Sequence, residues 1–216
     1  MIDSSARLQI LCAALAAALT WASPTIAQEP PPRIPLLVVD VHAHVLPFPQ
    51  DPQLAKSRDL NPSELPRLGL GGALGAHLYP LRWRAMTLGF GGQMTVSRAR
   101  RPLEAGSTLR STTERFTSIA PQVSFNFGTG TGWSYLSGGI AASTGSGVPD
   151  GVARRPEDDE RLTTINYGGG ARWFAKPHLA FSFDVRFYSI NPSTPGQLPS
   201  NPRTTLMIIG AGVSLK

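Results

Sequence analysis

Residues 163–190 read TTINYGGGARWFAKPHLAFSFDVRFYSI, and this stretch decides the predicted fold. Its second half alternates between apolar and polar side chains with the two-residue period of a β-strand. The apolar members are Leu179, Phe181, Phe183, Val185 and Phe187. The first half alternates in the same way up to Trp173, and residues 176–178 leave room only for a tight turn. The stretch therefore predicts a hairpin of two long β-strands.

The two faces of this hairpin differ in a way that indicates a membrane. Aromatic side chains gather on the apolar face, whereas glycine, small residues and charges occupy the other face. A water-soluble sandwich also alternates, but a transmembrane β-barrel inverts the pattern, with apolar side chains towards lipid and polar ones towards the lumen. On the lumen side we expect Asp184 to pair with Arg186, and with Arg172 across the hairpin.

The rest of the chain repeats this unit. Further alternating segments lie at residues 36–46, 68–79, 85–96, 118–127, 133–144 and 203–216. The connections between successive segments are alternately long and short, which is typical of an up-and-down barrel with tight periplasmic turns and long external loops. We therefore predict an all-β fold, an eight-stranded antiparallel up-and-down transmembrane β-barrel, over residues 36–216. The expected external loops are residues 47–66, 98–112, 145–160 and 191–202.

A barrel of eight strands has a lumen that its own side chains can fill. The glycine-rich and alanine-rich inward faces suit so narrow a bore. The polar side chains expected to plug it form a lumen polar cluster of Asp40, Gln93, Arg172, Asp184 and Arg186. The sequence thus predicts a barrel without an open channel.

The N-terminal residues have the features of an export signal. Arg7 precedes an apolar run that ends in small residues, so we predict a signal peptide over residues 1–27. Residues 28–35 are proline-rich and predict an extended lead-in to the first strand. The single cysteine, Cys12, lies within the predicted signal, so the mature chain would have neither a disulfide nor a thiol nucleophile.

The chain of 216 residues carries a formal net charge of +6. Its charges lie in loop-like segments without interleaved aromatic residues, which argues against a nucleic-acid partner. We expect this positive charge to attract the anionic head groups of lipids.

Several segments resemble a known family. The phrases PQVSFNFG (121–128), GWSYLSGGI (132–140) and TTLMIIGAGVSLK (204–216) are similar to strands of the bacterial outer-membrane β-barrel family, of the OmpA-type transmembrane domain or opacity-protein kind. The resemblance covers essentially everything after Pro35. It implies a monomer in the outer membrane of a bacterial cell, in contact with outer-membrane lipids and without a cofactor. It also implies a structural or surface-binding role carried by the external loops, with a ligand that the sequence does not name.

One motif points to different chemistry. Residues 40–44 read DVHAH and resemble the first metal-binding signature of amidohydrolases, in which two histidines of a strand bind zinc. That family needs a (β/α)₈ barrel with further ligands, and this chain shows no alternation of strands and helices. A second possibility is a metal site inside the barrel, in which His42, His44 and His77 face the lumen and bind one metal ion together. We favour the competing interpretation, in which these histidines hydrogen-bond to polar neighbours and no metal binds.

Two other functions stay open at this stage. An outer-membrane lipid-modifying hydrolase or acyltransferase would need a Ser–His pair, and none falls on a recognisable motif, so we name no catalytic residue and expect no enzymatic activity. A soluble lipocalin-like carrier would surround its ligand with apolar side chains. The charged residues that face inward in the predicted strands argue against such a carrier.

Overall fold

The computed structural model describes residues 32–57, 60–102, 111–151, 153, 159–191 and 204–216. The predicted signal peptide, residues 1–27, lies outside this part of the chain and stays a prediction, as does the lead-in up to residue 31. No helix in the described part is both long enough and apolar enough to cross a membrane.

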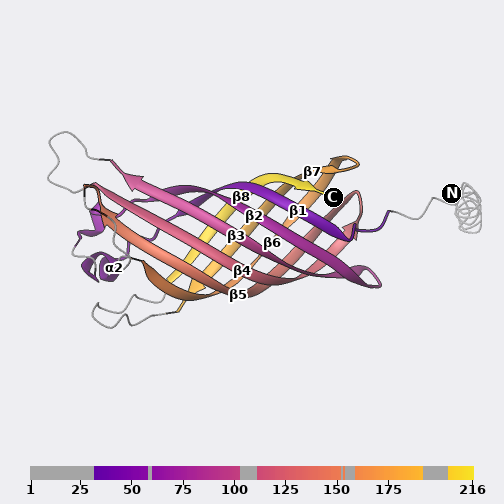
Figure 1. Ribbon diagram of the computed structural model, residues 1–216, viewed down its shortest axis with the longest axis horizontal. Coiled ribbons are helices and arrows are strands. Elements are labelled where there is room, and N and C mark those ends of the chain that lie inside the picture. The colour runs from indigo at the N-terminus through magenta and orange to yellow at the C-terminus, as the bar shows by residue number, and fades with distance from the viewer. Residues whose placement is uncertain (1–31, 58–59, 103–110, 152, 154–158, 192–203) are drawn as a thin grey trace, which may run out of the picture. The chain divides into compact units, whose positions relative to one another are not determined.

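The described residues form a closed barrel of eight antiparallel strands, each paired with its neighbours in sequence. The strands are β1 (Leu37–Pro47), β2 (Leu68–Trp83), β3 (Met86–Arg101), β4 (Thr112–Thr129), β5 (Gly132–Pro149), β6 (Glu160–Lys176), β7 (Leu179–Ile190) and β8 (Thr204–Leu215). The pairing of β1 with β8, for example Val41 with Val213, closes the barrel (Figure 1). The predicted fold class is therefore confirmed, and so is the hairpin over residues 163–190, as β6 and β7.

The long connections and the short turns lie at opposite ends of the barrel, which we call the loop end and the turn end. Figure 1 shows α2 (Pro52–Ser57) among the connections at the loop end, whereas the C-terminus lies at the turn end. A second short helix, η1 (Pro62–Glu64), lies in the same first connection. This connection was expected to be a polar loop without regular structure, and the structure corrects that expectation.

Strands β2 to β5 are longer than the sequence predicted, and β4 begins at Thr112 where residue 118 was expected. The segment around Pro80 was expected to be a turn, but β2 continues through it to Trp83 with a shift of register between Leu78 and Leu81. Proline is tolerated here because β2 beyond Tyr79 pairs only with β3, so the missing N–H breaks no second ladder. β3 and β5 likewise extend into the predicted loops, to Arg101 and Pro149. The small residues of β5 leave its facing ambiguous in the sequence, and its pairing with β4 extends the strand to Pro149.

Pro121 lies within β4, where it cannot donate to a ladder. The pairing of β4 with β5 is interrupted between Ile119 and Val123, yet the register on the two sides of the gap is the same. Gly139 on β5 faces the gap, and a Cβ there would overlap the carbonyl oxygen of Pro121. A glycine at position 139 therefore lets the two backbones approach closely without moving the strands out of register.

The outer surface of the barrel is apolar, as the alternation predicted. Large side chains that are exposed on every strand include Val41, Leu74, Met94, Ile119, Leu136, Ile165, Phe183 and Met207. At the turn end the exposed side chains include several aromatic ones, as at the edge of the apolar band of a membrane barrel. They are Trp83, Phe127, Trp173 and Phe181.

Candidate functional site

The lumen has three layers. A polar layer fills the middle, and each end is occupied by a cluster of buried apolar and aromatic side chains. The loop-end cluster consists of Leu46, Phe116, Leu162, Tyr188, Ile190, Leu206 and Ile208, with Phe48 packed against it. The turn-end cluster consists of Val38, Tyr79, Trp133 and Tyr135, with Ile34 and Phe174 packed against it. The polar layer was expected from the sequence, but neither of the two apolar clusters was.

Asp40 is the centre of one half of the polar layer. Arg172 donates to both of its carboxylate oxygens, from Nε to Oδ1 at 2.9 Å and from Nη2 to Oδ2 at 2.6 Å. The hydroxyl of Ser214 donates to Oδ1 at 2.5 Å, and Nδ1 of His77 lies 3.3 Å from Oδ2. Because these groups come from β1, β2, β6 and β8, a single carboxylate connects four strands across the lumen.

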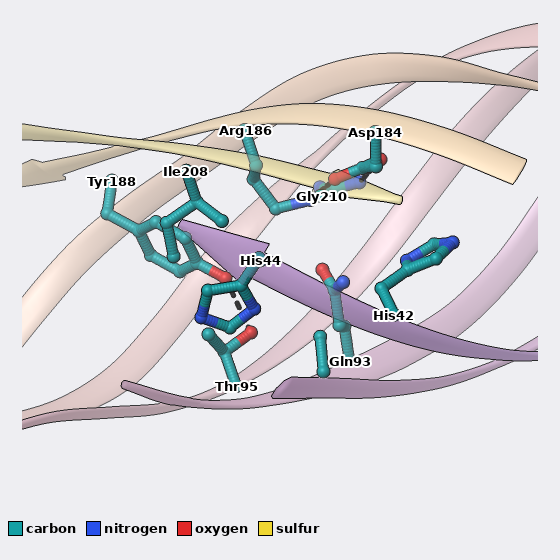
Figure 2. Close-up of a pocket in the computed structure, with 10 residues that line it drawn as sticks. His42, His44, Gln93, Thr95, Asp184, Arg186, Tyr188, Ile208 and Gly210 are labelled. Carbon is teal, nitrogen blue, oxygen red and sulfur yellow. Dashed lines mark hydrogen bonds and ion pairs between the residues drawn. The ribbon is translucent and has the colours of Figure 1, made fainter. Parts of the chain in front are cut away.

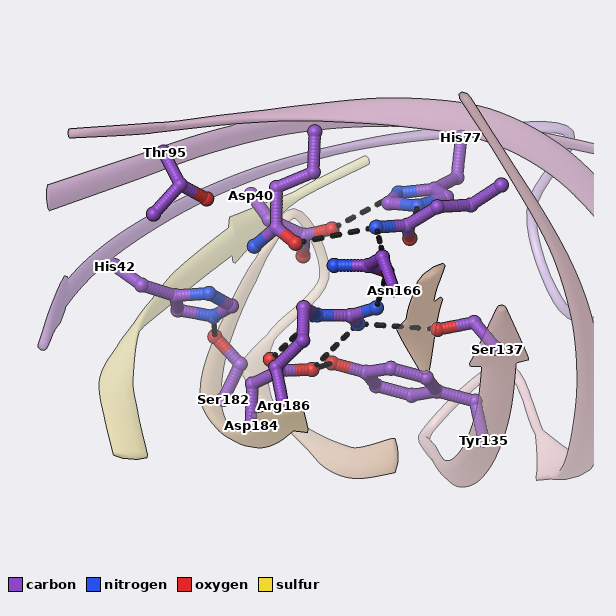
Figure 3. Close-up of polar contacts among 12 residues, drawn as sticks. Asp40, His42, His77, Thr95, Tyr135, Ser137, Asn166, Ser182, Asp184 and Arg186 are labelled. Atoms are coloured by element: carbon purple, nitrogen blue, oxygen red, sulfur yellow. Dashed lines mark hydrogen bonds and ion pairs between the residues drawn. The ribbon is translucent and has the colours of Figure 1, made fainter. Parts of the chain in front are cut away.

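Asp184 and Arg186, both on β7, form the other half. The guanidinium of Arg186 donates to both oxygens of Asp184 at 3.0 Å, and the hydroxyl of Tyr135 donates to Oδ2 at 2.6 Å. Arg186 also donates to Asn166 Oδ1 at 2.8 Å and to Ser137 Oγ at 3.0 Å, as Figure 3 shows. This second centre thus connects β7 to β5 and β6.

Two contacts join the halves into one network. Gln122 lies between His77 and Asn166, with its Oε1 3.4 Å from His77 Nε2 and its Nε2 3.1 Å from Asn166 Oδ1. The guanidinium carbon of Arg172 lies 4.2 Å from the ring centroid of Tyr135, which in turn bonds to Asp184. A guanidinium over an aromatic face is a favourable arrangement. The polar layer is therefore a continuous network and not a set of separate pairs.

The structure places all five residues of the predicted lumen polar cluster in this layer. Asp40, Gln93, Arg172, Asp184 and Arg186 are each exposed by 9% or less. One expected pairing was wrong, because Arg172 pairs with Asp40 and not with Asp184 across the hairpin. The alternation of side chains indicates which residues face inward, but the partner across a closed barrel depends on the stagger of all the strands.

The three lumen histidines have separate partners. Nε2 of His42 lies 2.7 Å from the hydroxyl of Ser182, and Nε2 of His44 lies 2.6 Å from that of Ser97, whereas His77 contacts Asp40 and Gln122. Within the described residues, no group of three or more His, Cys, Asp or Glu side chains is placed to hold a metal ion. The structure therefore does not assemble the metal site considered for these histidines.

The two Ser–His pairs were not apparent from the sequence, because their members are separated by 140 and 53 residues. In each pair the distance between the serine hydroxyl and the histidine nitrogen is that of a catalytic nucleophile and its base. His44 Nδ1 has no hydrogen-bond partner among the described residues, whereas a catalytic histidine is oriented through that atom. Figure 2 shows both histidines beside a lumen cavity of about 10 Å³, which is room for about one water molecule. No substrate fits there.

The first connection, at the loop end, has a small core of its own. Ala55, Leu60 and Leu65 are buried together. Asn61 and Glu64 form a capping box at the start of η1, and the backbone N–H of Phe48 donates to the carbonyl of Arg67 at 2.8 Å. This connection is therefore an ordered surface structure whose two ends meet.

Asp150 fastens the end of β5 to its neighbours at the loop end. Its carboxylate accepts hydrogen bonds from Ser111 at 2.7 Å, from Arg100 at 2.9 Å and from Thr113 at 2.9 Å. These hydrogen bonds lower the pKa of Asp150 to about 2. The carboxylate is therefore ionised at neutral pH, and its charge is matched by that of Arg100.

Comparison with known proteins adds to this description of the fold. No protein-family model and no curated protein sequence matches the chain. Among solved structures, Neisserial surface protein A is similar with a TM-score of 0.52 and 17% identity, covering 84% of this chain and 96% of that one. The outer membrane protein OprG from Pseudomonas aeruginosa has a TM-score of 0.46 and 9% identity, covering 86% and 97%. At these identities the similarity concerns the fold.

A closed antiparallel barrel with an apolar outer surface, a filled lumen and turns shorter than its loops is the architecture of a transmembrane β-barrel. The chain has the fold of the eight-stranded outer-membrane β-barrels. Barrels of this fold lie in the bacterial outer membrane, and their long connections face the outside of the cell.

Proposed function

We propose that the protein is a closed outer-membrane barrel that presents a binding surface at its loop end. The observation that carries this proposal is the three-layered lumen, in which apolar clusters cover both ends of a continuous polar network. A porin needs a wetted passage between its ends, and such channels occur in much wider barrels. Because the lumen is filled, other molecules can bind only at the external surface.

The first test is electrical. Purified protein in a planar bilayer is expected to give no steady conductance, because an ion would have to cross two apolar clusters as well as the polar layer. A variant with Trp133→Ala and Tyr79→Ala, which thins the turn-end cluster, should still be closed by the loop-end cluster. A large and reproducible channel in the unaltered protein would contradict the proposal.

The ordered first connection supports the binding part of the proposal. A surface that keeps its shape before a partner arrives loses less conformational entropy on binding than a flexible loop does. Here η1, the capping box and the buried Leu60 and Leu65 hold the segment in place, and Arg101 donates to the carbonyl of Ser63 from the end of β3. The Ser–His pairs are buried away from this surface, so the role that we propose is binding and not catalysis.

The second test removes this surface. Because Phe48 and Arg67 are hydrogen-bonded to each other, a short Gly-Ser linker in place of residues 51–64 should close without strain on β1 and β2. We expect cells that display this variant to lose most of their adhesion to one another and to immobilised mucin, relative to cells with the unaltered protein. Leu65→Ser, which opens only the small core, should give a partial loss.

Lys176→Ala, at the turn end, is the matched control and should leave adhesion unchanged. Heat-dependent mobility on gels would show that every variant is folded. Full adhesion by the linker variant would contradict a binding role for the first connection.

A further inference from the structure

Three arginines face outward near the loop end of β3, β4 and β6. They are Arg98, Arg115 and Arg161, and all are exposed. Arg98 and Arg115 are directly paired in the register of β3 with β4, and Arg161 is paired with Thr144 on β5. None of the three forms an ion pair with a residue in the described part of the chain. Among the described residues, these three arginines therefore bring positive charge that no ion pair compensates.

The height of these arginines places them at the edge of the membrane. A strand rises about 3.3 Å per residue, and a tilt of about 40° leaves about 2.5 Å per residue along the barrel axis. Phe127 at the turn end and Arg115 on the same face of β4 are thus about 30 Å apart in height. The lipid-facing band of such barrels is about 25 Å tall, so Arg115 lies just beyond its outer edge, where lipid head groups begin.

A groove runs along β5 between these arginines, because the outward side chains of β5 are small. The small side chains of Ala142, Thr144 and Ser146 are paired with larger ones on the flanking strands, namely Ile119, Arg161 and Arg115 in that order. The outer part of the groove is a depression of about 150 Å³ whose lining includes Arg98, Thr113, Arg115, Ser146 and Val148. The inner part is a depression of about 480 Å³ lined by Thr117, Ile119, Ala142, Ser143, Thr144, Arg161, Leu162 and Thr163. The two parts follow each other along β4 and β5, at Arg115 with Ser146 and then Thr117 with Thr144.

The groove therefore changes character along its length. Its outer part is bordered by guanidinium groups, and its inner part leads to the exposed side chains of Ile119, Ile140 and Ile165 on the apolar surface. Asp150 adds a negative charge to the outer part, but this carboxylate is already paired with Arg100 at 2.8 Å. In the part of the chain that the structure describes, the charge left for a ligand is that of Arg98, Arg115 and Arg161.

We propose that this groove, the β5 groove, binds a phosphorylated glycolipid of the outer leaflet. Its phosphate groups contact Arg98, Arg115 and Arg161, and one acyl chain lies over Ala142 towards Ile140. Guanidinium groups suit phosphate because they donate in a planar fork to two oxygens at once. An acyl chain suits the inner part because it covers the apolar surface that the small outward side chains of β5 leave exposed. The site is separate from the loop surface of the proposed function, so either can fail without the other.

The probe for this site is lipid A with both phosphates, added to the full chain in zwitterionic detergent and measured by native mass spectrometry. Arg115→Gln should weaken binding by about five-fold, and Arg115→Gln with Arg161→Gln by about 25-fold. Removal of both phosphates from the lipid should have a similar effect on the unaltered protein. Ala142→Trp, which fills the groove but keeps every charge, should weaken binding of lipid A by at least ten-fold.

Arg82→Gln is the matched control, since it removes an exposed arginine at the turn end. It should bind lipid A as the unaltered protein does. Equal losses in Arg82→Gln and Arg115→Gln would indicate attraction to net charge alone and would overturn the site. Inorganic phosphate that competes with lipid A at micromolar concentration, together with full binding by Ala142→Trp, would assign a free-anion site and would also overturn the proposal.

Discussion

Replacing Arg172 by glutamine should lower the free energy of unfolding by about 3–5 kcal/mol, because it leaves Asp40 charged and buried without its cation. The carboxylate of Asp40 is only 2% exposed, and Arg172 supplies two of its hydrogen bonds. Ser214 and His77 remain beside it, but neither carries the permanent charge of a guanidinium. Unfolding by urea in lipid vesicles, followed by tryptophan fluorescence, measures the loss.

The double variant, Arg172→Gln with Asp40→Asn, separates the effect of the charge from that of packing. It should recover more than half of the loss, because no unpaired charge stays in the lumen. Arg82→Gln removes an exposed arginine and should change stability by no more than about 0.5 kcal/mol. If Arg172→Gln proved as mild as this control, the lumen around Asp40 would have to be wet, and the description of a sealed barrel would be wrong.

Phe183→Arg should cost about 2–4 kcal/mol, since it places a charge in the hydrocarbon near the middle of the membrane. Phe183 is 43% exposed on the outer surface, between Phe181 and Val185 on β7. The neighbouring position, Asp184, lies at nearly the same depth but points into the lumen, so the cost at this depth depends on which way the side chain faces. The same urea titration in vesicles measures it.

Ser189→Arg provides the comparison on the same strand. Position 189 has the same facing as Phe183 but lies nearer the loop end, where a charge reaches the head groups and should cost about 0–1 kcal/mol. Phe183→Ala should also be mild, because it introduces no charge. Equal stability of Phe183→Arg and Ser189→Arg would show that this face does not contact lipid.

The closed lumen follows from how polar and apolar side chains are distributed along the inward faces. Polar side chains in the middle hydrogen-bond to one another, for example through Gln122, and the aromatic side chains of the turn-end cluster keep water from competing for those bonds. Arg186 illustrates the result, because it is 2% exposed and makes hydrogen bonds to Asp184, Asn166 and Ser137. Such a network holds the strands at a fixed spacing.

The sequence by itself determined the number of strands, their antiparallel order and the face that each side chain takes. These properties are local: a period of two along one strand, and a turn too short for any connection but a hairpin, as at residues 176–178. The same reasoning placed Asp40, Arg172 and Asp184 on inward faces. It also predicted long connections at one end, although it could not recognise η1 within the first of them.

Only the tertiary structure decided which inward side chains meet. Arg172 and Asp40 are 132 residues apart, and the stagger of eight strands around the closed barrel brings them together. The same is true of Ser182 with His42, and of Leu46 with Ile190 in the loop-end cluster. The β5 groove is likewise a product of four adjacent strands, since the register places Arg115 beside Ser146 and Ile119 beside Ala142. Alternation along one strand does not specify its register with the adjacent strands. These contacts therefore cannot be predicted from a pattern in one sequence.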